Sequence, residues 1–202
     1  MQPCVLTVLR SGGEYRVEHV KRLRDQVARH APGVPFRCIA DVDCPGRIEM
    51  RGDWPGWWAK IEAFTLPGPI LYMDLDTTIT GDPGPLLEAA AAHEFIALRD
   101  FTGGGGRTVQ SSVMAWRGRA VAGMHDRFAA DPAGHMAFCT TPRWWGDQGF
   151  IELHGPGPAF WQDVAPGAVV SFKMHCQGGV PDGARVVAHH GKPRPWEVEE
   201  AA

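Results

Sequence analysis

Short apolar runs alternate with stretches of helical spacing from the start of the chain. The first apolar run covers residues 4–9, and after a glycine-containing turn apolar side chains recur every three or four positions from Val17 to Val27. A second apolar run covers residues 36–41. This order of strand, helix and strand predicts the βαβ unit of a parallel sheet, which binds ligands beyond the carboxyl ends of its strands.

The same alternation continues through the rest of the chain. Further strands are predicted at residues 95–98, 110–116, 169–173 and 185–190, and helices at residues 61–64, 86–93, 119–130 and 143–153. Four consecutive glycines at residues 103–106 predict a mobile loop. Neither an internal repeat nor a domain boundary interrupts the pattern, so we expect one α/β domain over residues 1–196 and a polar tail over residues 197–202.

The most distinctive polar residues lie in a predicted buried strand at residues 69–79. Asp74 and Asp76 directly follow four apolar residues. Strand alternation would put both carboxylates on one side of the strand, about 6–7 Å apart. Two carboxylates beside a buried strand are costly unless a cation lies between them. The pair therefore favours a divalent ion, Mn²⁺ or Mg²⁺, with a phosphate beyond it, and the alternative is that both acids only cap a strand in solvent.

The composition of the chain narrows the classes of partner and the compartment that we expect for it. The net charge of −3 over 202 residues gives no broad electrostatic attraction to nucleic acid or to an anionic membrane. Five cysteines without a Cys-x-x-Cys spacing favour a reducing compartment. No apolar run has the length of a membrane span. We therefore expect a cytoplasmic protein with no nucleic-acid partner, whose eight tryptophans include aromatic surfaces for a base or a sugar ring.

Five landmarks in fixed order resemble a known family. They are Lys60 just before the motif strand, the Asp-x-Asp segment at residues 72–76, Asp100 with the strand after it, Asp147-Gln148, and the terminal segment at residues 190–196. This order resembles the retaining glycosyltransferases of the GT-A fold that include glycogenin and the bacterial lipopolysaccharide galactosyltransferases. The resemblance implies a single-domain, Rossmann-like sheet that binds a nucleotide-sugar and is flanked by helices.

The resemblance also implies an activity and a set of site residues. It implies metal-dependent transfer of a hexose from a UDP-linked sugar to an unknown acceptor, with retention of configuration. The implied metal ligands are Asp74, Asp76 and His190. The implied donor-binding residues are Asp74, Gln110, Lys192 and Arg194. The turn after the first apolar run adds Arg10 and Gly12, because its glycines allow a ligand to approach the backbone closely. The implied catalytic residues are Lys60, Asp100, Asp147 and Gln148.

The terminal segment departs from the family pattern. The family's metal-binding histidine lies three residues before the glycine, a position occupied here by Ala188, and Arg194 stands where lysine is usual. If residues 185–190 form a strand, His190 lies on the same side as position 188, and His189 faces the opposite side. We therefore predict that His190 is the metal ligand. An imidazole ligand favours Mn²⁺ over Mg²⁺.

Two other functions remain open. Asp74-Leu75-Asp76-Thr77-Thr78 also fits the Asp-x-Asp-x-Thr signature of haloacid-dehalogenase phosphatases, in which the first aspartate attacks phosphorus. Against it, at least two strands precede the motif, and the usual glycine before the threonine is Thr77. The third alternative is a non-catalytic nucleotide-sugar-binding protein. Four tryptophans either stack on an acceptor sugar or belong to the core: Trp57, Trp58, Trp144 and Trp145.

Overall fold

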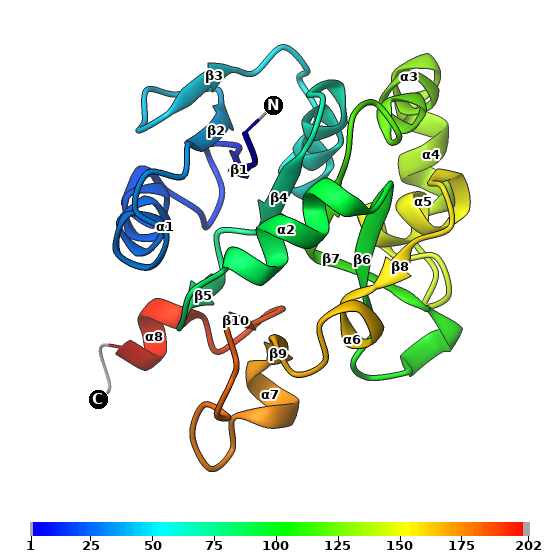
Figure 1. The fold of residues 1–202 in the computed structure, drawn as a ribbon. Helices are drawn as coiled ribbons and strands as arrows, with labels where there is room; N and C mark the ends of the chain where they lie inside the picture. Colours follow the sequence, from blue (N-terminus) through cyan, green and yellow to red (C-terminus); the bar gives the residue numbers. More distant parts are fainter. Residues whose placement is uncertain (1, 200–202) are drawn as a thin grey trace.

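A seven-stranded sheet forms the centre of the protein in a computed structural model that describes residues 2–199 (Figure 1). Its strands are β1 (Cys4–Leu9), β2 (Phe36–Ala40), β3 (Arg47–Glu49), β4 (Ile70–Met73), β6 (Phe95–Arg99), β7 (Val109–Trp116) and β8 (Ala159–Phe160). They lie in the order β3-β2-β1-β4-β7-β6-β8. Strands β1 to β4 are parallel and β7 is antiparallel to both of its neighbours. The order therefore reverses between β1 and β4, the point at which open α/β sheets bind ligands.

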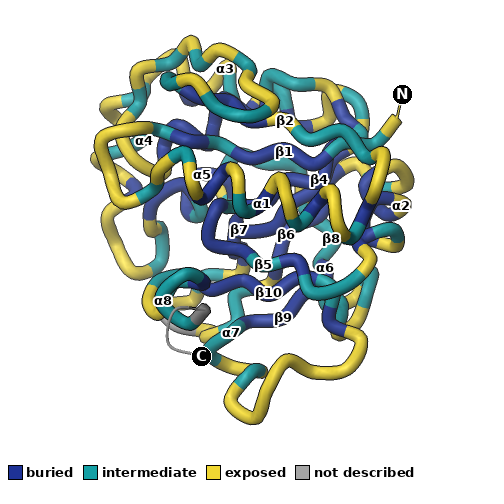
Figure 2. Tube along the Cα trace, turned by 90° about the vertical axis from the view of Figure 1, so that its left-hand side faces the viewer, coloured by how far each residue is buried: buried dark blue, intermediate teal, exposed yellow. Residues whose placement is uncertain are grey.

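A second, three-stranded sheet lies next to the carboxyl end of β4 (Figure 2). It consists of β5 (Thr77–Ile79), β10 (Val186–Ala188) and β9 (Val169–Ser171), in the order β5-β10-β9. The chain passes from the large sheet to the small one through the Asp-x-Asp segment. The predicted single strand over residues 69–79 is therefore wrong: β4 ends at Met73, and the Thr77 N–H donates to the Asp74 carbonyl across a turn at 3.1 Å.

Helices cover both faces of the large sheet. One face carries α1 (Val17–His30), α2 (Gly84–Ala92) and α6 (Trp161–Val164), and the other carries the 3₁₀ helix η1 (Gly56–Thr65), α3 (Ala122–Ala130) and α5 (Gly146–His154). Shorter helices are η2 (Gly104–Gly106), α4 (Pro132–Phe138), α7 (Phe172–His175) and α8 (Pro195–Glu199). The predicted α/β architecture of a sheet flanked by helices is confirmed.

The apolar residues whose spacing predicted α1 form the side of the helix that is buried. Val20, Leu23 and Val27 are fully covered against β1 and β2, and burying each such side chain contributes about 2 kcal/mol. The other face of the sheet is filled mainly by aromatic rings, with Trp58 stacked on Phe128. These two layers fix the sheet, and with it the strand ends that carry the polar residues.

The later elements are shorter than predicted. The strand predicted over residues 169–173 ends at Ser171, whose hydroxyl accepts from the Met174 N–H and begins α7. The strand predicted over residues 185–190 ends at Ala188, so both histidines lie beyond it. Residues 197–199 continue α8, and residues 200–202 of the expected tail lie outside the described residues. Across residues 2–199, no helix is long and apolar enough to cross a membrane.

Candidate active site

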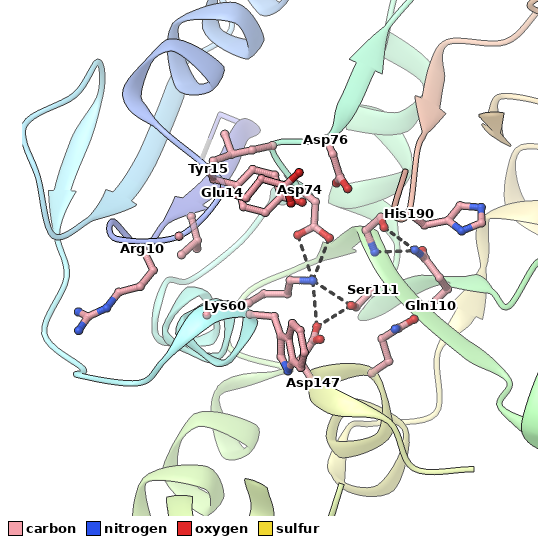
Figure 3. Close-up of a pocket in the computed structure, with 18 of the residues that line it drawn as sticks. Arg10, Glu14, Tyr15, Lys60, Asp74, Asp76, Gln110, Ser111, Asp147 and His190 are labelled. Atoms are coloured by element: carbon pink, nitrogen blue, oxygen red, sulfur yellow. Dashed lines mark hydrogen bonds and ion pairs between the residues drawn. The ribbon is translucent and has the colours of Figure 1, made fainter. Parts of the chain in front are cut away.

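A pocket of about 1000 Å³ opens at the carboxyl ends of β1 and β4 (Figure 3). Its walls come from the turn after β1, the Asp-x-Asp segment after β4, the start of α5 and the segment after β10. Because several parallel strands end at this edge, their following residues converge without any local sequence relationship. Eleven of the predicted site residues line this pocket: Arg10, Gly12, Lys60, Asp74, Asp76, Asp100, Gln110, Asp147, Gln148, His190 and Arg194.

Lys60 lies at the base of the pocket and joins four elements. Its Nζ is 3.0 Å from the Asp74 carboxylate, 2.9 Å from Asp147 Oδ2 and 2.9 Å from Ser111 Oγ (Figure 3). The Ser111 hydroxyl donates to Asp147 Oδ2 at 2.6 Å, and the Tyr72 hydroxyl donates to Asp74 Oδ1 at 2.7 Å. The Lys60 side chain is only 7% exposed. The hydrogen bonds therefore hold two carboxylates and one ammonium in a fixed, largely dry arrangement.

The charges of this cluster shift each other's protonation. Burial raises the pKa of Asp74 to about 6, with Lys60 opposing the rise and Asp76 adding to it. Burial alone would lower the pKa of Lys60, but Asp147 and Asp74 raise it above its ordinary value. Lys60 therefore stays protonated at neutral pH. The base of the pocket combines a permanent ammonium with a carboxylate that is costly to ionise.

Arg194 forms a second cationic cluster on the other acid of the motif. Its guanidinium donates to Asp76 Oδ2 through Nη1, and it donates to Glu14 through Nη2 at 2.7 Å and Nε at 3.1 Å. The guanidinium carbon is 5.1 Å from the centre of the Tyr15 ring. Burial raises the pKa of Tyr15 well above its ordinary range, and nearby Asp76 adds to this rise. Arg194 thus pairs with one of the two aspartates between which the sequence predicted a divalent ion.

The two adjacent histidines occupy different environments. His190 lines the pocket, its Nε2 is 2.6 Å from Ser171 Oγ, and its ring stacks on Phe101. His189 is buried and stacks on Phe172. Strand alternation is not the cause, since β10 ends before both residues. The chain instead turns at His190, whose φ is 29°. Burial and nearby Lys173 lower the pKa of His190, so its ring is neutral at pH 7.

The predicted divalent ion fits this pocket in charge and in donor type. The lining contains six carboxylates but four lysine and arginine side chains, an excess of two negative charges. Carboxylate oxygens and a neutral imidazole suit Mn²⁺. Over the described residues 2–199, however, no three or more His, Cys, Asp or Glu side chains are arranged to hold a metal ion. Arg194 already pairs with Asp76, one of the three predicted ligands.

The remaining predicted residues have distinct surroundings. Gln110 hydrogen-bonds to Ser112, and Asp100 accepts from Thr102 and pairs with Arg107 at 3.2 Å. Burial tends to raise the pKa of Asp100, but the hydrogen bonds from Thr102 and Arg107 bring it below the usual value. Arg10 pairs with Asp53. Lys192 does not line the pocket: its side chain is 75% exposed and pairs with Glu197 at 3.2 Å.

Several pocket residues were missed by the sequence analysis. Two of them, Glu14 and Tyr15, contact Arg194. Two others, Ser111 and Tyr72, supply hydroxyl groups to the Lys60 cluster. Tyr72 and Ser111 lay inside segments that the sequence had marked, and their places two residues before Asp74 and next to Gln110 were a usable signal. Glu14 lay 180 residues from Arg194, and no local pattern joined them.

Comparison with known proteins rests on structure alone. No family model and no curated protein matches the sequence. The galactosyltransferase LgtC, solved with donor and acceptor sugar analogs, superposes with a TM-score of 0.63 at 11% identity, over 95% of this chain and 88% of that one. A glycosyltransferase involved in glycosylation of the major capsid of PBCV-1 superposes with a TM-score of 0.58 at 13% identity, over 98% of both chains.

A third solved structure is matched over only part of its own length. The glycosyltransferase GlyE of Streptococcus pneumoniae TIGR4 superposes with a TM-score of 0.61 at 12% identity over 96% of this chain. This chain spans 55% of the length of GlyE. The expected resemblance is confirmed at the level of architecture, and the protein has the fold of the GT-A glycosyltransferases.

Proposed function

We propose that this protein is a glycosyltransferase that moves a hexose from a UDP-linked sugar to an acceptor, with retention of configuration. The observation that carries the proposal is the pocket at the β1–β4 switch point, where Lys60 and Arg194 each bridge one acid of the Asp-x-Asp segment to another carboxylate. A fold likeness at this identity supports the class of reaction only together with such a site.

The turn after β1 is suited to the nucleotide. Gly12 has a φ of +85°, and nothing lies within 4 Å of the position that its Cβ would take. A backbone without a side chain here leaves space for close approach of a flat base or ribose. Arg10 lies on the same turn, paired with Asp53. We assign the β1 turn to the nucleoside and Arg194 to the diphosphate, which a guanidinium binds through paired hydrogen bonds.

Asp74, Asp76 and His190 would hold a divalent ion, which when bound would neutralise charge on the diphosphate. The chain's own groups act on the sugar. We assign Asp100 and Gln110 to its hydroxyls and Lys60 to the carboxylates of Asp74 and Asp147 beneath them. We assign Gln148 and Asp147 to the side of the reacting carbon, and all of these residues line the pocket. In the reaction the bond from the anomeric carbon to the diphosphate oxygen breaks, and its electron pair leaves with UDP.

Retention is supported by the ion pairs that the carboxylates lining the pocket make. All six carboxylates pair with a lysine or an arginine: Glu14, Asp53, Asp74, Asp76, Asp100 and Asp147. Inversion needs a carboxylate that is free to take the acceptor proton. In the retaining reaction proposed here, the acceptor oxygen bonds to the same face of the anomeric carbon, and its proton goes to the departing diphosphate oxygen.

The phosphatase alternative makes a specific demand on Asp74. An aspartate that attacks phosphorus needs an accessible carboxylate oxygen. Here Asp74 Oδ1 accepts from Tyr72 and Oδ2 accepts from Lys60. These contacts favour a positioning role over a nucleophilic one. The glycosyltransferase architecture favours the same choice.

The test is thermal stability with UDP-glucose, UDP-galactose and UDP, each with Mn²⁺ or with EDTA, followed by release of free sugar. A ligand at 100 times its Kd stabilises the folded state by about 2.7 kcal/mol. We expect a shift with at least one UDP-sugar and slow hydrolysis of it, and loss of hydrolysis with retained binding in Gln148→Ala. Absence of any shift would contradict the proposal. Hydrolysis of an aryl phosphate that is lost in Asp74→Asn would select the phosphatase.

A further inference from the structure

The four tryptophans near the pocket fall into two classes. Trp58 is buried against Phe128, and Trp144 is covered by the Arg143 guanidinium, whose carbon is 3.7 Å from the ring centre. Trp57 and Trp145, by contrast, are 53% and 46% exposed and both line the pocket. Two indoles left exposed beside one pocket forgo the hydrophobic stabilisation that burial would give, and neighbouring exposed apolar surfaces of this kind mark binding sites.

The two exposed rings form one platform. Their centroids are 6.3 Å apart and the ring planes are inclined by 43°. Gly146 has a φ of +60°, and a Cβ there would lie 3.0 Å from Trp57 Nε1, so the absence of a side chain makes room for that indole. We call Trp57 and Trp145 together the platform. Gly146, between Trp145 and Asp147, leaves the space that the Trp57 ring occupies.

The platform is tied to the reacting end of the pocket. In a 3₁₀ helix the side chains at positions i and i+3 lie above each other, so Trp57 stands one turn from Lys60 on the same side of η1. Trp145 lies two residues before Asp147 at the start of α5. Figure 3 shows Lys60 and Asp147 on the opposite side of Asp74 from Glu14 and Tyr15. The platform therefore belongs to the end of the pocket that carries Lys60 and Asp147, away from the Glu14 and Tyr15 that contact Arg194, the residue assigned to the diphosphate.

We propose that Trp57 and Trp145 bind the acceptor, and that the acceptor presents an uncharged pyranose ring to them. One face of such a ring carries several C–H groups, which pack on the electron-rich face of an indole. The excess of two carboxylates in the lining disfavours an acidic acceptor. This inference rests on the transferase function proposed above, and it identifies the chemical class of the second substrate.

The experiment follows the indole N–H resonances of ¹⁵N-labelled protein, assigned with Trp57→Phe and Trp145→Phe. UDP is added first, and then lactose, maltose, methyl β-D-glucoside, methyl β-D-galactoside or methyl β-D-glucuronide. We expect at least one neutral sugar to shift both platform resonances in a saturable, millimolar titration, and the glucuronide to bind at least fivefold more weakly. In Trp57→Ala, transfer to that sugar relative to hydrolysis of the donor by water should fall at least tenfold.

Phe138 provides the matched control, because it is 55% exposed but does not line the pocket. Phe138→Ala should leave the ratio of transfer to hydrolysis unchanged. If no neutral sugar moves either resonance while UDP binds, the acceptor assignment is overturned and the transferase proposal stands. If UDP alone saturates both shifts, the platform belongs to the donor. Failure of every UDP-sugar to bind would instead remove the transferase proposal.

Discussion

Lys60 and Arg194 do the same electrostatic task in two different surroundings. Each cation bridges one aspartate of the Asp-x-Asp segment to a second carboxylate, Lys60 from Asp74 to Asp147 and Arg194 from Asp76 to Glu14. The Lys60 side chain is 7% exposed and is enclosed by the large sheet and its helices. The Arg194 side chain is 14% exposed and comes from the segment after β10, where it lines the pocket.

The difference in surroundings gives the two cations different roles. Lys60 is a structural cation, which stays with its carboxylates, and Arg194 is an exchangeable cation, which a ligand can draw away from them. Removing Lys60 would leave the buried Asp147 and the half-buried Asp74 unpaired, because no other cation pairs with either of them among the described ion pairs. Arg194 has a long side chain that lines the pocket, so a ligand that offers phosphate oxygens can compete for its guanidinium. The positive charge of Lys60 therefore holds the base of the pocket together, and the positive charge of Arg194 is a binding group for a ligand.

The largest expected effect comes from removing the structural cation. Lys60→Met should lower the free energy of unfolding by about 3–5 kcal/mol, because it leaves buried carboxylates without their partner. Urea unfolding of the purified variant measures this loss. Lys192→Met is the matched control, since Lys192 is an exposed lysine whose ion pair is worth less than about 1 kcal/mol. Equal losses in the two variants would contradict the distinction.

The same distinction marks what the sequence revealed. The two aspartates were found because they directly follow a strongly apolar run, and Lys60 was found through the family resemblance. The fold followed for the same reason, since apolar spacing fixes β1, α1 and the other long elements. The turn between Asp74 and Asp76 was missed because an apolar run does not show that its two halves belong to different sheets. Arg194 was identified through the family pattern, but its contact with Glu14 exists only through the tertiary fold.

The second prediction tests whether Arg194 is exchangeable. Arg194→Gln removes the charge that competes with a metal ion for Asp76, and it also removes a phosphate-binding group. We expect Mn²⁺ binding without nucleotide to become at least fivefold tighter and UDP binding to become at least tenfold weaker. Calorimetry of the two ligands measures the opposite signs, and Arg194→Lys should lie between the wild type and Arg194→Gln. Weaker Mn²⁺ binding in Arg194→Gln would instead make Arg194 a fixed structural cation like Lys60.

The last prediction concerns the carboxylate that Lys60 holds, whose effect within any one pH unit is small. The pKa of Asp74 is raised to about 6 in the folded protein, chiefly by burial, from an ordinary value of 3.8. Between these values the folded state keeps a proton that the unfolded state has lost. This contribution to stability is complete below the ordinary pKa and disappears as pH rises through about 6. Its slope is at most about 1.4 kcal/mol per pH unit.

Subtraction isolates this contribution from the other carboxylates. Asp100 and Glu152 have lowered pKa values, since hydrogen bonds from Thr102 and Arg143, respectively, outweigh burial, so their stabilisation is lost as pH falls. Both are present in the wild type and in Asp74→Asn and cancel in the difference. We expect the difference in unfolding free energy, wild type minus Asp74→Asn, to decrease from pH 4.5 to pH 7. A difference that stays constant over this range would mean that Lys60 outweighs burial and that Asp74 is ionised throughout, in which case Lys60 would stabilise a charge pair that costs little to bury.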